Sequence, residues 1–499
     1  MAGTLMPMTS LQALSRASVP TDKLILKQKP LISGIVHIGL GNFHRAHLAV
    51  YTAIAMEKSG GEWGICAYSM RNKKLVDSMN AQDNLYSVVE IGPDTEEIVI
   101  PGIHTRSLVG ADAMPELIAQ IANPETKIVS LTVTEAGYYI SQATHGLDLS
   151  HPDIQNDIAQ KVPKSIYGIL AQSLKLRVAN GGAALTILSC DNVSENGRKC
   201  GALLKEFVSQ LSDFSDVATF INSSVTFPNS MVDRIVPGTE EHHIEMAQQR
   251  LSLEDAIPVP AEKFTMWALE DNFAAGRPQW EVAGAIFTDE VEAFEVMKLR
   301  LLNGAHSLLA YLGGLKGCET IPASRFDPLI EKPLHKALFD EYLPSLTMPT
   351  GLSADQYIGQ LYSRWSNTTL GDKTSRVGSD GSTKLPQRLT IPALSAIAQG
   401  REPKVLALTV SAWLMCVAPF KGFNPGEIAE QMKDPSKDSL VLLSQTSKDL
   451  SNFISRFFSE SNIFSSELSS SQVFTSLVEN YAQIIYSRGI DEAIAAAIS

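Results

Sequence analysis

A short β-branched run that ends in two closely spaced glycines is the feature that most restricts the fold of this chain. Residues 34–41 read GIVHIGLG and lead directly into a helical stretch over residues 43–58. A strand that passes through glycines into a helix is the setting of a dinucleotide-binding turn. Gly39 would allow the tight turn, and Gly41 would let backbone amides approach a pyrophosphate. His44 stands where a third glycine is usual, so an ordinary turn between a strand and a helix remains an alternative.

The rest of the N-terminal half alternates between apolar runs and helical patterns. The runs lie at residues 63–70, 127–134, 182–189 and 221–227, and helical stretches lie between them, for example at residues 165–180 and 194–211. This alternation predicts a parallel sheet covered on both faces. Strand patterns then fade, and helical patterns follow at residues 291–312, 392–399, 404–417 and 472–488. We therefore predict an α/β, dinucleotide-binding domain over residues 1–290 and a mostly α-helical domain over residues 291–499.

Charge and composition exclude several classes of protein. The net charge of −13 argues against a nucleic-acid surface, which normally carries a basic patch. No apolar run approaches 18 residues, and the first 30 residues lack the layout of a signal peptide, so we expect no membrane span and a cytoplasmic location. The five cysteines are scattered, with no Cys-x-x-Cys pair, which favours neither disulfides nor a cysteine zinc site. We expect no bound metal.

One apolar helix carries four polar residues that suggest acid–base chemistry. At about 100° per residue, Glu295, Lys298, Asn303 and His306 fit an arc of about 140°. Burial disfavours the charged amine and lowers the pKa of such a lysine. A neutral Lys298 can then take a hydroxyl proton while hydride leaves carbon, without a metal. The alternative is a lysine that extends to solvent beside the core, with Asn303 and His306 in structural roles.

Other polar residues follow predicted strands, where parallel sheets bind ligands. Asn192 could donate to a developing alkoxide. Glu135 ends another strand, and Asp233 lies in a mixed polar loop; alone, each is more typical of a cap or a turn. The second strand ends in SMRNKK without the usual acid for an adenosine ribose. Arg71 or Lys73 could instead accept the 2′-phosphate of NADP, or both could be solvated turn residues.

Together these segments resemble the mannitol dehydrogenase family of long-chain, metal-independent polyol dehydrogenases, which includes fructuronate and altronate reductases. The matching stretches run in order along the chain, at residues 34–47 (GIVHIGLGNFHRAH), 132–138 (TVTEAGY), 189–192 (SCDN), 227–235 (FPNSMVDRI), 270–273 (EDNF) and 298–306 (KLRLLNGAH). The missing third glycine agrees with this family's own form of the turn.

The resemblance implies a Rossmann-type N-terminal domain, a largely helical C-terminal domain and an active site in the cleft between them. It implies that Lys298 is the general base for alcohol oxidation, that Asn192 and Asn303 stabilise the oxyanion, that His306 binds substrate oxygens and that Glu295 moves protons to solvent. It also suggests substrate-binding roles for Asp233, Arg376 and Lys384. The expected cofactor contacts are Gly39, Gly41, Asn42, Phe43, His44, Arg71 and Glu135.

The leading hypothesis is reversible oxidation of D-mannitol to D-fructose with NAD, and NADP stays open because the acid is missing. Reduction of a sugar acid such as fructuronate is an alternative, since Arg376 or Lys384 could hold a carboxylate. A third hypothesis, outside the class of enzymes, is a nucleotide-binding regulator without catalysis. The presence of all four polar residues Lys298, Asn303, His306 and Asn192 argues against it. The only partner expected is a small polyol or ketose, and a monomer is compatible with the resemblance.

Overall fold

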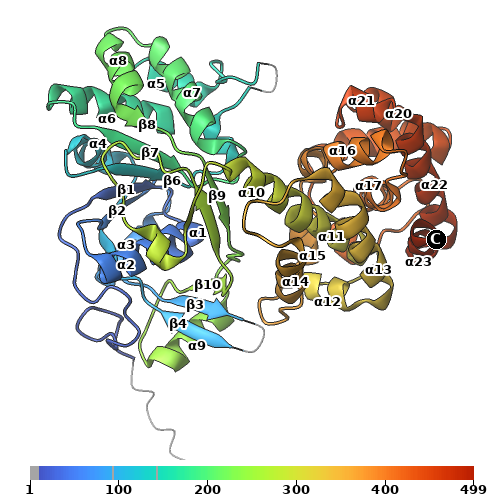
Figure 1. Ribbon diagram of the computed structural model, residues 1–499, viewed down its shortest axis with the longest axis horizontal. Coiled ribbons are helices and arrows are strands. Elements are labelled where there is room, and N and C mark those ends of the chain that lie inside the picture. The colour runs from blue at the N-terminus through green and yellow to red at the C-terminus, as the bar shows by residue number, and fades with distance from the viewer. Residues whose placement is uncertain (1–10, 93–94, 142–143) are drawn as a thin grey trace, which may run out of the picture. The chain divides into compact units, whose positions relative to one another are not determined.

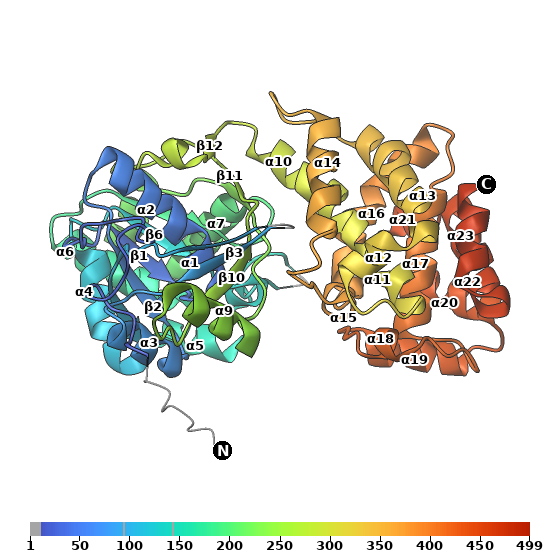
Figure 2. The same ribbon diagram turned by 90° about the horizontal axis from the view of Figure 1, so that it is seen from below.

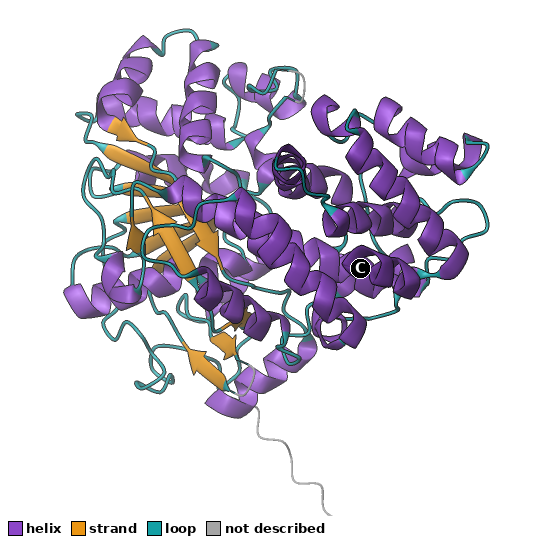
Figure 3. Cartoon of the chain, turned by 45° about the vertical axis from the view of Figure 1, so that its right-hand side comes forward, coloured by secondary structure: helices purple, strands orange, loops and turns teal. Residues whose placement is uncertain are grey.

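The computed structural model describes residues 11–92, 95–141 and 144–499. The chain forms two compact units, residues 1–292 and 293–499. Every strand described lies in the first unit, and the second is built from helices (Figures 1 and 3). None of the helices in these residues is both long and apolar enough to cross a membrane.

A six-stranded sheet, parallel throughout, forms the centre of the first unit, in the order β5-β2-β1-β6-β7-β8. Its strands are β1 Ile35–Ile38, β2 Ile65–Ser69, β5 His104–Val109, β6 Ile128–Leu131, β7 Leu185–Ser189 and β8 Val225–Thr226. Counted along the chain, this is the 3-2-1-4-5-6 order of a Rossmann-type sheet. The order reverses between β1 and β6, so the carboxyl ends of these two strands mark the place where such sheets bind ligands.

Side chains alternate between the two faces of this sheet, and helices cover both. Val36 and Ile38 belong to one buried cluster with residues of α4 and α6, whereas Ile35 packs with residues of α2. The helices of this unit are α1 Asn42–Ala46, α2 Leu48–Ser59, α3 Lys73–Ala81, α4 Met114–Ala122, α5 Pro152–Ile158, α6 Ile166–Ala179, α7 Asn196–Ser209, α8 Ser215–Ser224 and α9 Glu241–Leu251. The predicted doubly covered sheet is therefore confirmed.

Two small mixed sheets complete the first unit (Figure 2). One contains β10 Val259–Glu262, β3 Val88–Ile91 and β4 Glu96–Val99, and the other β12 Ile286–Phe287, β11 Met266–Leu269 and β9 Ser230–Asp233. Two predictions need correction. The helix expected over residues 43–58 is divided at His47, which has φ −119° and ψ −92°. The strand expected over residues 221–227 is mostly the end of α8, and only Val225 and Thr226 pair with β7.

Arg177 ties helix α6 to the segments that lead into β6 and β7. Its guanidinium is buried and donates five hydrogen bonds of 2.6–2.9 Å to backbone carbonyls, those of Ile121, Asn123, Thr126, Ala183 and Ala184. A planar five-donor group suits such a cluster, and no other side chain offers it.

Replacing Arg177 with methionine is expected to lower the free energy of unfolding by about 3 kcal/mol, because the carbonyls lose charged donors in a buried place. Urea denaturation of the whole protein measures the loss. Lys205→Met, at an exposed position on α7, is the control and should change stability by less than about 0.5 kcal/mol. A loss under about 1 kcal/mol for Arg177→Met would contradict the structural role.

The second unit is an assembly of helices around α17 Lys404–Val417, in which every residue from Val405 to Val417 is buried. The others are α10 Val291–Met297, which begins at the end of the first unit, α11 Ala305–Leu315, α12 Ile321–Phe326, α13 Pro328–Lys336, α14 Ala354–Trp365, α15 Thr374–Val377, α16 Gly381–Ala398, α18 Glu427–Glu430, α19 Lys437–Thr446, α20 Leu450–Glu460, α21 Ser466–Ser469, α22 Gln472–Arg488 and α23 Ile490–Ile498. Two segments are π-helices: η4 Lys298–Gly304 and η5 Ala337–Tyr342. The predicted helices over residues 404–417 and 472–488 are confirmed at both ends.

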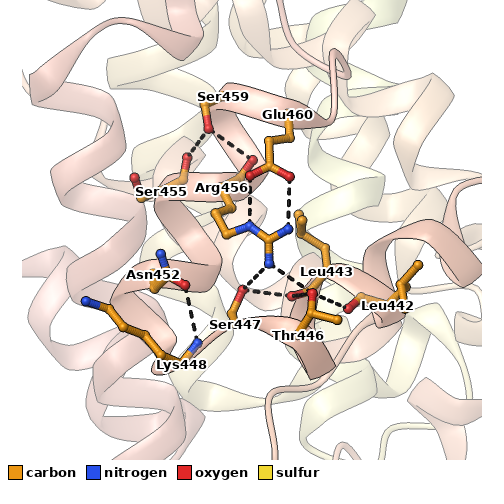
Figure 4. A network of polar contacts seen from close by, with 10 residues as sticks. All are labelled: Leu442, Leu443, Thr446, Ser447, Lys448, Asn452, Ser455, Arg456, Ser459 and Glu460. Atoms are coloured by element: carbon orange, nitrogen blue, oxygen red, sulfur yellow. Dashed lines mark hydrogen bonds and ion pairs between the residues drawn. The ribbon is translucent and has the colours of Figure 1, made fainter.

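A polar network joins α19 to α20 on the surface of this unit (Figure 4). Arg456 makes a two-pronged ion pair with Glu460, with N–O distances of 2.8 and 3.0 Å. Its remaining nitrogen donates to the hydroxyl oxygens of Thr446 and Ser447 at the end of α19. The ion pair is solvent-exposed, so we assign the network a local role in holding the two helix ends.

Candidate active site

The turn after β1 can be built only with glycine at position 39. Gly39 has φ +108°, and a Cβ placed there would overlap the carbonyl oxygen of Thr132, the residue after β6. The Thr132 hydroxyl donates a 2.8 Å hydrogen bond to the Gly39 carbonyl. The two strands that flank the reversal of the sheet are therefore joined directly at their carboxyl ends.

Gly41 has a different environment, and it fits a dinucleotide. Its backbone is extended, with φ −129° and ψ −176°. A Cβ at this position would have only one neighbour within 4 Å, the Gly39 carbonyl oxygen at 3.7 Å. The lack of a side chain therefore leaves open space beside the backbone at the start of α1, which suits the close approach of a pyrophosphate.

The side chains of the next three residues of the turn make contacts within the protein. The Asn42 amide donates to the carbonyl of Pro237 at 3.2 Å and to the hydroxyl of Thr239 at 3.3 Å. The Phe43 ring stacks on His47, with 4.9 Å between ring centroids. His44 is completely buried. Contacts from Asn42 and His44 to a cofactor would thus come from their backbone atoms, and their role as cofactor residues stays a prediction.

Three buried histidines lie beneath this turn. The rings of His37 and His44 stack with 3.4 Å between centroids, and His44 Nε2 lies 3.0 Å from Nε2 of His104. His37 also contacts Ser130 Oγ at 2.9 Å and Thr132 Oγ1 at 2.9 Å. Burial, the largest cause, lowers the pKa of His37 and His104 to about 3, so the stack is neutral at pH 7.

This stack predicts that acid destabilises the protein. His37 and His104 accept protons near pH 6.5 in the unfolded chain and only near pH 3 in the folded one, so the unfolded state binds more protons between these values. Stability is complete above pH ~6.5 and falls as the pH drops toward 3, by up to about 1.4 kcal/mol per pH unit for each histidine. Urea titrations between pH 7 and 5 measure the slope. His104→Gln should reduce it, and an unchanged slope in that variant would contradict the assignment.

The two remaining cofactor candidates follow strands of the main sheet and are exposed. Arg71 lies after β2, one residue before the N-cap of α3. Glu135 begins a short 3₁₀ turn after β6. Asp191 holds this turn, since its carboxylate accepts hydrogen bonds from the Thr134 amide at 2.9 Å and the Tyr138 hydroxyl at 3.0 Å. Asp191 therefore has a structural role in this turn, and the N-cap of α7 is Glu195.

Asn192 and Asp233 lie on two segments of the first unit, and the side chain of Asn196 joins these segments by hydrogen bonds. Asn192 is exposed in the loop after β7, and Asp233 ends strand β9 with only 3% of its surface exposed. The amide of Asn196 donates to the carbonyl of Asp191 at 3.0 Å and to that of Ser230 at 2.8 Å. The position of Asn192 is therefore coupled to β9 by neutral hydrogen bonds.

The four polar residues of the apolar helix lie on a segment that is not a regular α-helix. Glu295 lies on α10, Lys298 and Asn303 on η4, and His306 in the first turn of α11. A π-helix takes more residues per turn than an α-helix, so the uniform 100° spacing assumed from sequence is wrong across residues 298–304. All four residues are partly exposed, and such π segments are frequent at functional sites.

Arg376 and Lys384 lie on α15 and α16, and each contacts an acid. Arg376 donates to the carboxylate of Asp372, with an Nε–Oδ1 distance of 3.0 Å. The Lys384 amine donates to the Ser379 carbonyl at 2.7 Å and lies 3.6 Å from the carboxylate of Asp380. Burial and the neighbouring positive charge of Arg388 lower the pKa of Lys384.

Sequence reasoning missed three residues that contact the Gly39 turn or the segment η4. Thr132 and His37 fix the Gly39 turn through the contacts described above; Thr132 belongs to a matched motif but gives no signal of its own role. Arg388 of α16 donates to the carbonyl of Asn303 at 3.0 Å. It is one cation on a long helix, and nothing in the sequence indicates which backbone group it meets.

Comparison with protein families gives two matches that cover most of the chain. The family model described as the mannitol dehydrogenase Rossmann domain matches residues 33–282, and the one described as the mannitol dehydrogenase C-terminal domain matches residues 290–485.

Individual proteins match over similar lengths. The D-mannonate oxidoreductase of Escherichia coli (strain K12) is 36% identical over 487 residues, which cover 96% of this chain and 99% of that protein. The mannitol 2-dehydrogenase of Phaeosphaeria nodorum is 36% identical over 438 residues, covering 86% and 76%. The solved ternary complex of Pseudomonas fluorescens mannitol 2-dehydrogenase with NAD and D-mannitol superposes with a TM-score of 0.83 at 32% identity, covering 97% and 99%.

Proposed function

The chain belongs to the mannitol dehydrogenase family, and on this premise we propose that it is a metal-independent dehydrogenase that oxidises D-mannitol reversibly to D-fructose with NAD. The observation that carries the proposal is the helical segment of the second unit on which Lys298, Asn303 and His306 are all partly exposed. An amine, an amide and an imidazole on one segment supply a base, a hydrogen-bond donor to an oxyanion and a group that orients hydroxyls.

In this proposal bound NAD supplies the hydride acceptor, and the residues of the chain handle the proton and the oxygen. The neutral amine of Lys298 takes the hydroxyl proton as the C–H electron pair leaves the same carbon. The amide groups of Asn303 and Asn192 donate hydrogen bonds to the oxygen while it carries negative charge. Glu295, three residues before Lys298, passes the proton on to solvent. In the reverse direction the lysine ammonium protonates the oxygen of the ketone.

Further residues would select the substrate. We propose that His306 and Asp233 contact hydroxyl groups, and that Arg376 and Lys384 contact the far end of the chain of carbons. Gly39 and Gly41 would bring backbone amides to the pyrophosphate of the cofactor.

A sugar acid is the second candidate substrate, favoured by the cations of α15 and α16. Arg388 lies one helical turn beyond Lys384 on α16, and the positive charges of Arg388 and Arg376 both act on Lys384, whose pKa is lowered chiefly by burial, although Asp380 opposes them. A carboxylate is the natural partner of such a group. The similarity to a D-mannonate oxidoreductase over nearly the whole of both chains supports this candidate as well.

One assay separates the candidates. NADH and NADPH formation would be measured with mannitol, arabinitol, sorbitol, mannonate and altronate at equal concentrations. We expect turnover of mannitol with NAD. Turnover of the two acids alone would replace the polyol assignment with the sugar-acid one, and a preference for NADPH would place Arg71 at the 2′-phosphate. NADH binding without turnover of any of the five would favour a regulator.

A further inference from the structure

The π-helix η4 needs support from other parts of the fold. Lys298 is its first residue and Asn303 its last but one, so its geometry determines how these two side chains are placed relative to each other. The π conformation is rare and intrinsically poor, because its hydrogen bonds span five residues instead of four. We therefore expect this conformation to depend on contacts from other parts of the fold.

One support is steric. A Cβ on Gly304, the last residue of η4, would lie 2.5 Å from Cζ of Tyr342 and 2.6 Å from its hydroxyl oxygen. Tyr342 is fully buried and belongs to the second π-helix, η5. The ring therefore lies directly against the backbone at the point where η4 ends.

The second support is electrostatic and comes from Arg388. Its Nη1 donates to the Asn303 carbonyl at 3.0 Å and to Ser307 Oγ at 2.8 Å. The Ser307 hydroxyl in turn donates to the Asn303 carbonyl at 3.3 Å. This carbonyl thus receives two side-chain donors at the place where the π register returns to the α register, and one of the donors is charged, which makes it roughly twice as strong as a neutral one.

The same arginine is one helical turn beyond Lys384 on α16. Its positive charge acts on Lys384, where it is the second cause of the lowered pKa after burial. Arg388 therefore contacts the segment that carries the proposed base and acts on a proposed substrate-binding residue.

We propose that Arg388 is a positioning residue, which holds the Asn303 carbonyl and thereby keeps η4 in the π conformation that sets Lys298 and Asn303 for catalysis. The proposal rests on the proposed dehydrogenase function for its catalytic part. Its structural part, the support of η4 by Arg388, stands on the contacts alone.

The test compares Arg388→Met, Arg388→Lys and the matched control Gln387→Met, the last at an exposed position next to Arg388 on α16. Hydrogen exchange of residues 298–308 is measured by mass spectrometry, and kcat, KM and NADH affinity are measured on the full-length protein. For Arg388→Met we expect faster exchange confined to this segment, a fall in kcat of about 30-fold and NADH affinity within about twofold of wild type. Arg388→Lys should recover part of kcat, since lysine can still donate to the carbonyl.

Unchanged exchange in Arg388→Met overturns the proposal, whatever the activity. Wild-type kcat in that variant, with faster exchange, overturns the catalytic part. A general rise in exchange over the whole second unit would assign Arg388 to overall stability and also overturn the proposal. If the wild-type protein oxidises none of the five substrates, the proposed function fails, and the exchange comparison still decides whether Arg388 holds η4.

Discussion

Replacing Lys298 with methionine is expected to lower kcat for alcohol oxidation by about 10³-fold, within the range that a positioned acid–base group contributes. Methionine keeps the side chain as far as Cε and removes the amine, so the hydroxyl proton has no basic acceptor on η4. NADH affinity and the melting temperature should stay near their wild-type values, because the nucleotide turn lies in the other unit of the chain. Stopped-flow measurement of NADH formation by the wild type and the variant, with the best substrate of the assay above, gives the ratio of the two kcat values.

Chemical rescue distinguishes a lost base from a distorted site. Lys298→Ala should regain part of its activity when small primary amines are added, in proportion to the concentration of the neutral amine. Lys332→Met, at an exposed position on α13, is the control and should keep wild-type kcat. Activity of Lys298→Met equal to wild type near neutral pH would remove the lysine from the mechanism.

Gly39→Ala is expected to abolish measurable NADH binding and to lower the free energy of unfolding by more than about 3 kcal/mol. A methyl group there would meet the Thr132 carbonyl, and the φ of +108° is strained for any residue with a Cβ. Calorimetric titration with NADH and urea denaturation measure the two effects.

Gly41→Ala is the matched variant. It should weaken NADH binding without the loss of stability that is expected for Gly39→Ala. Its methyl group has room, with one neighbour at 3.7 Å, so stability should change by less than about 1 kcal/mol. NADH affinity should still fall by about tenfold or more, because the methyl group occupies the space proposed for the pyrophosphate. Unaltered affinity in Gly41→Ala would move the cofactor away from this turn.

The sequence patterns predicted what depends on periodicity and missed what depends on packing. Helix α17 is mostly apolar and ends before Pro419, so its length can be predicted from the apolar run and the proline that follows it. The segment 221–227 has the β-branched and aromatic residues of a strand, yet α8 packs Phe220 and Ile221 into the core as helical residues. Tertiary contacts override local preference there.

The same distinction between local pattern and tertiary packing applies to the candidate site. The positions of Gly39 and Gly41 were predictable, because a strand followed by closely spaced glycines has few structural solutions. That His44 would be buried against His104, 60 residues away, depends on contacts that no local pattern records. The π conformation of η4 likewise depends on Arg388 and Tyr342, which lie far along the chain. The roles of the individual site residues stay predictions.

The π-helix η4 also restricts how the chain can change in length. A π turn accommodates about one residue more than an α turn, so removing a single codon within residues 298–304 would restore a continuous α-helix. The helical parts before and after the deletion would keep their orientation relative to each other, because the turn that holds the extra residue is lost together with that residue. A one-residue deletion inside this segment would therefore leave Lys298 and His306 on one side of the helix, whereas the same deletion in the regular helix α11 would rotate everything beyond it by about 100°.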